Sequence, residues 1–262
     1  MGFIHSLGYL DVDKCSYINA FSRCSPITKL CFSLSGILIS VSAPSPFVPI
    51  IVFAVVTVLL LIFAEVPAKL YFKLMIFPIF FAIISCFLIA LFFGSENPIA
   101  YLRVQGYEII IFGDAVRLAT TLFFRVLGGV SALFFLSLTT PMMDIWIVLR
   151  KIGIPAVLAE VSILTYRYLF VLLEVASRMH LAQELRLGYS TLRRTFQSLC
   201  LLVTNLFIET LLQGERTFNA MTARGYDGTI RAVDEAPKPG LRAAVGIAVF
   251  DALMVFLILL RT

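Results

Sequence analysis

Arginine and alanine recur at helical spacing in two polar segments of the chain. Both segments read Arg-x-x-x-Ala-x-x-x-Arg, with Arg178, Ala182 and Arg186 in the first and Arg216, Ala220 and Arg224 in the second. Residues spaced by four lie along one face of a helix. A guanidinium group offers five donors in a fixed fork to a carboxylate or carbonyl cluster, and a small residue lets a partner backbone approach. The pattern predicts two helix ends that dock on a pair of similar partners.

The two copies differ in the residues beside the final arginine. The second copy reads Ala223-Arg224-Gly225, whereas the first reads Leu185-Arg186-Leu187, with glycine one position later at Gly188. An arginine followed by glycine also suits an ordinary helix C-terminus, because the cation meets the helix dipole and glycine takes the left-handed cap. That interpretation accounts for one copy. The repetition of arginine, alanine and a following tyrosine favours a shared docking role.

The composition indicates a polytopic α-helical membrane protein. Of 262 residues, 60% are hydrophobic and only 14% are charged, and several apolar runs approach the roughly 20 residues that a bilayer span needs. The net charge of +5 fits an excess of cations on cytoplasmic loops and favours no nucleic-acid partner. The five cysteines follow no disulfide or zinc spacing.

We expect about five transmembrane helices and a three-helix arm on the cytoplasmic side, inserted before the last span. The predicted spans are residues 29–41, 47–64, 70–93, 115–139 and 241–260, and the predicted arm helices are residues 142–151, 156–187 and 192–224. This divides the chain into an N-terminal lead with four spans (1–140), a coupling-helix region (141–235) and a linker with the last span (236–262). Residues 94–114 are predicted to form an outer loop. The cationic loops place the N-terminus in the cytoplasm of a multi-pass cell-membrane protein.

Charged and small residues within the apolar runs predict specific packing. Arg125 lies deep in the fourth span and should face the bundle, because exposure to lipid is costly. Gly128 and Gly129 offer a face for close helix contact. Glu174 and Arg178 are spaced for an i,i+4 pair rather than for an ion path.

Several motifs together resemble a known transporter family. They are the run from Glu215 to Gly228 that contains Ala223-Arg224-Gly225-Tyr226-Asp227-Gly228, then Thr140-Pro141, Gly153-Ile154-Pro155, Tyr166-Arg167-Tyr168, and a lead with Leu10-Asp11, Asn19, Pro26 and Lys29-Leu30. The chain resembles the transmembrane coupling (T) component of energy-coupling factor (ECF) transporters, of the CbiQ/EcfT family, and is most similar to the CbiQ type of cobalt importers. The resemblance covers nearly the whole sequence.

The resemblance implies a role for each arginine stripe. In that family an Ala-Arg-Gly motif ends each of two coupling helices, and each arginine docks on one of two ABC ATPases. The matching ATPase-docking residues here are Arg186 with Leu185 and Leu187, and Arg224 with Ala223 and Gly225. Arg178, Ala182, Arg216 and Ala220 form the supporting stripe.

The expected partners follow from the same resemblance. They are two ABC ATPases of the CbiO/EcfA type and a membrane subunit that captures the substrate, of the CbiM type with a CbiN-like companion as an option. The chain carries no Gly-x-x-x-x-Gly-Lys-Ser/Thr phosphate loop, so ATP and Mg²⁺ belong to the partner ATPases. We expect no catalytic residue, no cofactor and no metal site in this chain, and therefore no enzyme activity of its own.

Three alternatives remain open at the level of the sequence. The cargo is cobalt or nickel, or else a vitamin carried by a T component that is dedicated or shared among capture subunits. A stand-alone secondary transporter or channel would need ionisable residues along a membrane path. A membrane-embedded enzyme would need a cluster of nucleophiles, and the sequence shows none.

Overall fold

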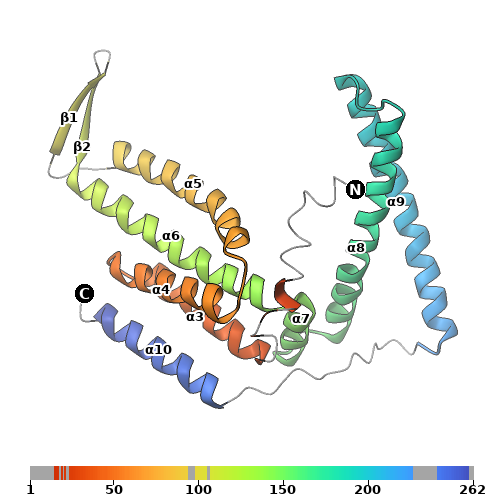
Figure 1. Ribbon diagram of the computed structural model, residues 1–262, viewed down its shortest axis with the longest axis horizontal. Coiled ribbons are helices and arrows are strands. Elements are labelled where there is room, and N and C mark those ends of the chain that lie inside the picture. The colour runs from red at the N-terminus through yellow and green to blue at the C-terminus, as the bar shows by residue number, and fades with distance from the viewer. Residues whose placement is uncertain are drawn as a thin grey trace. The chain divides into compact units, whose positions relative to one another are not determined.

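The computed structural model describes residues 15–17, 19, 21, 24–93, 98–104, 107–226 and 241–259. The predicted lead motif Leu10-Asp11 lies outside these residues. The chain divides into two compact units, which are treated separately below. The bundle unit includes α3 to α6 and α10, and the arm unit includes α7 to α9 (Figure 1).

Five apolar helical segments form most of the described part of the bundle unit. They are α3 (Pro26–Ser42), α4 (Phe47–Val58) continued by a π-helical turn (Leu59–Phe63), α5 (Ala68–Phe92), α6 (Gly113–Thr139) and α10 (Leu241–Leu259). Each lies within about three residues of its predicted bounds. The π-helical turn ends where the Ala64 N–H donates to the Leu59 carbonyl at 2.9 Å, and Glu65 then takes a left-handed conformation with φ 54°.

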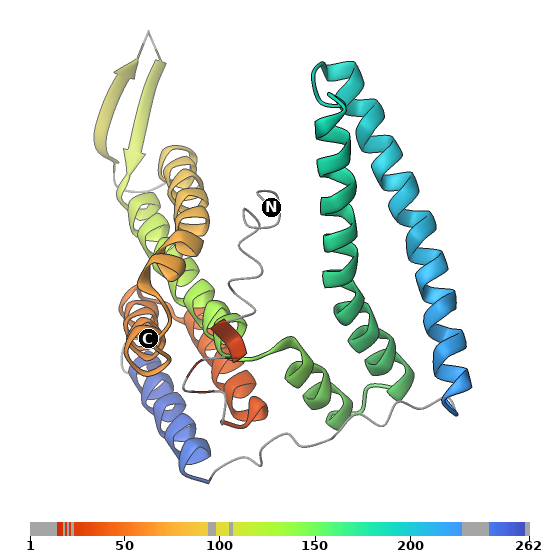
Figure 2. The same ribbon diagram turned by 45° about the vertical axis from the view of Figure 1, so that its right-hand side comes forward.

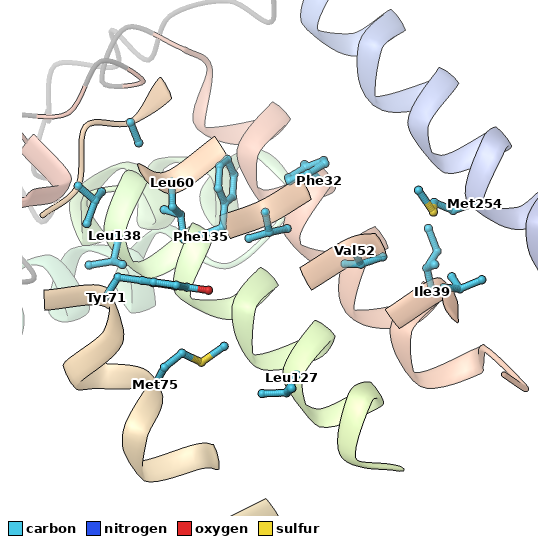
Figure 3. Packing of buried hydrophobic residues seen from close by; sticks show 14 of the residues in the cluster. Phe32, Ile39, Val52, Leu60, Tyr71, Met75, Leu127, Phe135, Leu138 and Met254 are labelled. Carbon is cyan, nitrogen blue, oxygen red and sulfur yellow. The ribbon is translucent and has the colours of Figure 1, made fainter. Parts of the chain in front are cut away.

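Helix α6 lies at the centre of this unit and packs on α3, α4 and α5. Its inward side chains include Leu127, Phe135 and Leu138, which join one cluster with Phe32 of α3 and Tyr71 of α5 (Figure 3). The rings of Phe32 and Phe135 meet edge to face with centroids 5.1 Å apart. This geometry suits the aromatic quadrupole and adds to the burial energy.

Of the two neighbouring glycines of α6, only Gly128 lies in close contact with other helices. A Cβ on Gly128 would lie 2.7 Å from the Ser40 Oγ and 3.0 Å from the Pro49 carbonyl, so α3 and α4 approach the helix backbone there. A Cβ on Gly129 would meet nothing within 4 Å. Close contact was therefore predicted correctly at Gly128, and Gly129 faces open space instead.

Arg125 faces the bundle, as predicted. Its Nε and Nη2 donate to the Ala43 carbonyl at 2.9 and 2.6 Å. Ala43 is fully buried at the C-terminal end of α3, where a helix leaves carbonyl groups without intrahelical partners. The guanidinium therefore satisfies a backbone group that has little access to water.

Residues 94–114 contain a β-hairpin rather than only the predicted loop. Strand β1 (Pro98–Val104) pairs antiparallel with β2 (Tyr107–Phe112), with Arg103 opposite Glu108. Both segments are rich in β-branched and aromatic residues, and only Gln105-Gly106 separates them in the sequence. Two such segments separated by two residues predict a β-hairpin. The prediction of a loop considered only the charged residues of this segment and overlooked that pattern.

The helices confirm an all-α membrane protein. Within the described ranges, three helices are long and apolar enough to cross a bilayer, namely α5 over Ala68–Leu91, α6 over Gly113–Thr139 and α9 over Leu192–Ala223. Shorter apolar helices cover Pro26–Ser42, Phe47–Phe63 and Val245–Ile258. Helix α9 thus meets the same length and composition criterion as the two longest helices of the bundle unit, although it was predicted to belong to a non-spanning arm.

The described residues of the arm unit form one short and two long helices. They are α7 (Met142–Lys151), α8 (Ala156–Leu185) and α9 (Leu192–Ala223). Gly153, with φ 110°, makes the turn from α7 into α8. Helices α8 and α9 run side by side in opposite directions (Figure 2). The three helices match the predicted arm helices closely, and together they position both arginine motifs.

Candidate partner-docking site

The first arginine motif forms the C-terminal cap of α8. Arg186 is the cap residue. The Leu187 N–H donates to the Glu184 carbonyl at 2.9 Å, and the Gly188 N–H donates to the Gln183 carbonyl at 2.9 Å. These two bonds define a Schellman motif, which satisfies the last carbonyls of the helix.

The second motif ends α9 in the same way. Arg224 is the cap residue. The Gly225 N–H donates to the Thr222 carbonyl at 3.0 Å, and the Tyr226 N–H donates to the Met221 carbonyl at 3.1 Å. The backbone angles of the two arginines agree, with φ −93° and ψ 15° at Arg186 and φ −94° and ψ 8° at Arg224. The two helix ends are therefore equivalent in backbone structure, despite their different sequences.

The late glycine of the first motif has its own structural cause. Leu187 takes the left-handed conformation with φ 56°, where the second motif has Gly225 with φ 82°. Gly188 is needed for a different reason, because a Cβ there would lie 2.6 Å from the Ser198 Oγ and 2.9 Å from the Gln183 carbonyl. In the first motif a leucine therefore occupies the left-handed cap position, and the glycine lies one residue later, where it allows close contact with α9.

A hydrogen-bond network joins the α8 cap to the start of α9. The Tyr189 hydroxyl donates to Gln183 Oε1 at 2.7 Å, and it lies 2.7 Å from His180 Nδ1. Since the phenol has one proton, His180 Nδ1 is the donor in the second contact. Gln183 Nε2 donates to the Ser198 carbonyl at 3.0 Å, and the Ser198 Oγ donates to the Gly188 carbonyl at 2.9 Å.

The environment of this network keeps Tyr189 protonated. Loss of hydration raises the pKa of the Tyr189 phenol, and the charge of the nearby Glu184 carboxylate raises it further. The phenol is therefore a hydrogen-bond donor throughout the neutral range. The second cap has a more open setting, since a Cβ on Gly225 would meet nothing within 4 Å.

Both cap arginines are exposed and available to a partner. Among the described residues, neither the Arg186 nor the Arg224 side chain makes a hydrogen bond or an ion pair. Beside Arg186, the leucines Leu185 and Leu187 expose 78% and 67% of their surface.

The remaining stripe residues behave differently. Arg178 pairs with Glu174 at 3.8 Å, as predicted, and Arg216 pairs with Glu209 at 3.6 Å. These pairs are largely exposed, so each contributes little to stability. Ala182 and Ala220 are also exposed, so both stripes present a small residue one turn before the cap.

The two caps do not come together. Helix α9 has 32 residues, and at 1.5 Å per residue its ends are about 48 Å apart. Arg186 lies near the start of that helix, and Arg224 lies at its far end. Reasoning from the sequence identified the cap residues but missed the network of His180, Gln183, Tyr189 and Ser198. The displaced glycine at Gly188 was the one signal for it.

Comparison with known proteins places the chain in a family. The CbiQ family, described as cobalt transport protein, matches residues 19–234. An uncharacterized protein of Methanocaldococcus jannaschii is 38% identical over 258 residues, which make up 98% of this chain and 94% of that protein. A putative fused cobalt transport protein CbiMQ of Methanocorpusculum labreanum is 33% identical over 244 residues, or 93% of this chain and 41% of the fused protein. The cobalt transport protein CbiQ of Salmonella typhimurium is 32% identical over 137 residues, or 51% of this chain and 61% of that protein. This chain belongs to the CbiQ family of cobalt transport proteins.

Proposed function

We propose that this chain is the transmembrane coupling subunit of an ECF-type ABC importer. Two ATPase subunits bind the caps of α8 and α9, and their ATP-driven movement is passed through these helices to a substrate-capture subunit in the membrane. The chain itself performs no catalysis. The observation that carries the proposal is the pair of matched helix ends, each with an exposed arginine whose side chain has no partner in the described part of the chain.

The separation of the caps supports two docking partners rather than one. A small domain is about 30 Å across, and the two ends of α9 are about 48 Å apart. One such domain does not reach both arginines. Two copies of one ATPase meet this requirement if each provides the same groove for a helix end, and the matched backbone angles at Arg186 and Arg224 support such a shared groove.

The sequence has no phosphate loop, which supports the proposal that the partner subunits, and not this chain, bind and hydrolyse ATP. Without that loop, the ATP and its Mg²⁺ are assigned to the partner ATPases. In this proposal the arginines bind protein groups on the ATPases, such as a carboxylate or a carbonyl cluster.

The relatives support cobalt as the cargo, and nickel stays the second candidate from the sequence analysis. The family is described as a cobalt transport protein, and one relative is a putative fused CbiMQ protein. A fusion of this kind supports a CbiM-like capture subunit as a partner in the membrane. The proposed orientation has the N-terminus and the arm unit in the cytoplasm, where the ATPases have access to ATP.

A copurification experiment tests the proposal. The chain is coexpressed with the ATPases and the capture protein encoded beside it, and the variant Arg186→Glu with Arg224→Glu is compared with the parent. The reversed charge opposes an acidic groove, so loss of ATPase copurification and of cobalt uptake is expected, and each loss should exceed that of the double alanine variant.

The matched control changes two other exposed cations of the arm unit. Lys151→Glu with Arg193→Glu alters the net charge equally but leaves both caps intact. Retained copurification in this control, with loss in the cap variant, supports docking at the caps. Unchanged ATPase copurification and uptake in the cap variant would refute the proposed role.

A further inference from the structure

The two helix ends that carry the cap arginines differ in the side chains beside them. Leu185 and Leu187 lie on either side of Arg186 and expose 78% and 67% of their surface. Beside Arg224 the same two positions hold alanine and glycine, although the backbone angles of the two arginines agree. The first helix end therefore presents two large apolar side chains that the second helix end lacks.

A partner that binds the Arg186 side chain also covers these leucines. A helix is about 10 Å across, and neighbouring Cα atoms are only about 3.8 Å apart. A groove that receives the helix end therefore extends over the residues on both sides of the arginine. Leu185 and Leu187 then lose contact with water when the partner binds, and burial of this apolar surface strengthens the complex beyond the hydrogen bonds of the guanidinium.

One kind of groove then binds the two helix ends with different strength. A groove with room for the leucines beside Arg186 leaves that room unfilled beside Arg224, where the flanking residues are alanine and glycine. Groove atoms next to unfilled space lose their dispersion contacts. The two arginines offer the same guanidinium donors, so the difference between the two complexes lies in the apolar contacts.

The first helix end is also tied to a second helix before any partner binds. The Ser198 Oγ of α9 donates to the Gly188 carbonyl at 2.9 Å, and Gln183 Nε2 donates to the Ser198 carbonyl at 3.0 Å. Among the described residues, the hydrogen bonds of residues 221–226 stay within α9 and its cap. A segment that is held in its bound conformation loses less conformational entropy on binding, so this difference also favours the first helix end.

We propose that the first helix end, with Leu185, Arg186 and Leu187, is the high-affinity docking site for an ATPase subunit, and that the second helix end is the low-affinity site. The partner groove that fits the first end has acceptors for the guanidinium at its centre and an apolar wall beside each leucine. Assembly begins at Arg186 and is completed at Arg224. The inference rests on the proposed coupling function and adds the chemistry and the order of its two docking steps.

Two single-end variants of the full-length chain measure the two sites separately. Arg224→Glu keeps the first helix end, and Arg186→Glu keeps the second. Each variant is immobilised in detergent and titrated, without nucleotide, with the purified ATPase subunit encoded beside the chain. We expect the Kd of the variant that keeps the first end to be lower by about 10- to 100-fold, because two leucine side chains become partly buried in that complex alone.

Changes of the flanking residues assign this difference to the leucines. In the variant that keeps the first end, Leu185→Ala with Leu187→Gly should raise the Kd to about that of the second end. Glycine suits the left-handed backbone at position 187, so misfolding would not explain the loss. In the variant that keeps the second end, Ala223→Leu should lower the Kd. The matched control Leu201→Ala removes a leucine within α9 that exposes 59% of its surface, and it should leave both Kd values unchanged.

The possible results separate this inference from the proposed function. Failure of the parent protein to bind the ATPase, or full binding by the double variant Arg186→Glu with Arg224→Glu, would overturn both. Equal Kd values for the two single-end variants, or a lower Kd at the second end, would leave the docking function intact and overturn the inference. The inference would also be wrong if removal of both leucines left the Kd of the first end unchanged, because they would then contact lipid or another subunit instead of the ATPase.

Discussion

Leu187 and Gly225 occupy the same position in two matched helix ends. Each follows the cap arginine, and each has a left-handed backbone, with φ 56° at Leu187 and 82° at Gly225. In this region the Cβ of leucine comes too close to the backbone carbonyl that follows it, whereas glycine has no Cβ. The first cap is therefore a strained version of the second, and the strain lies next to Arg186.

Replacing Leu187 with glycine should stabilise the arm unit. The left-handed conformation destabilises the folded state of a non-glycine residue by about 1–2 kcal/mol. Glycine removes this strain, but its greater freedom in the unfolded chain offsets about 0.5–1 kcal/mol of the gain in unfolding free energy. We expect a net gain of roughly 0.5–1 kcal/mol, visible as a higher thermal unfolding midpoint in detergent. Gly225→Ala should lower the midpoint. An unchanged or lower midpoint for Leu187→Gly would show that the strain is absent.

Gly188→Ala should destabilise the turn between α8 and α9. The new Cβ would lie 2.6 Å from the Ser198 Oγ, and relief of such overpacking costs about 1–3 kcal/mol. The measurement is the rate of limited proteolysis at this turn, compared with that of Gly214→Ala, whose Cβ would meet nothing within 4 Å. Equal rates for the two variants would contradict the close contact.

The structure explains which parts of this site were accessible from the sequence. The helix bounds and both cap arginines followed from apolar runs, arginine spacing and breakers such as Gly153 and Pro155, all of which are local signals. The equivalence of the two helix ends was predicted from the repeated spacing, but the left-handed backbone of Leu187 was not, because leucine disfavours that conformation. That conformation is held by tertiary contacts of Gly188 and Tyr189 with α8 and α9, which no local spacing encodes.

Removal of the Tyr189 hydroxyl should loosen the connection between the helices. Tyr189→Phe breaks the contacts to Gln183 and His180, with an expected loss of about 1 kcal/mol in unfolding free energy. The folded state raises the pKa of this phenol, so the stability from its neutral form is present below its ordinary pKa of about 10. That stability is lost as the pH rises through the folded-state pKa.

Unfolding midpoints measured between neutral pH and about pH 11 for both proteins check this sign. The parent protein should lose more stability than Tyr189→Phe above its ordinary pKa. A parallel decline of the two proteins over the whole range would show that Tyr189 does not contribute.

Arg125→Met should destabilise the bundle unit. The change removes two hydrogen bonds to the buried Ala43 carbonyl, and a hydrogen bond from a charged group contributes about 1.5–3 kcal/mol. Arg125→Lys keeps a charged donor and should lose less. Thermal unfolding in detergent followed by circular dichroism ranks the three proteins, and a lysine variant no more stable than the methionine variant would contradict the capping role.

Site-specific crosslinking tests the central claim most directly. A photoreactive amino acid is placed at Leu185 and, separately, at Ala223, each directly before a cap arginine, and the intact complex is irradiated with its ATPases and capture subunit present. The account predicts that each position crosslinks to an ATPase subunit. Crosslinks from either position only to the capture subunit, or to no subunit, would contradict it.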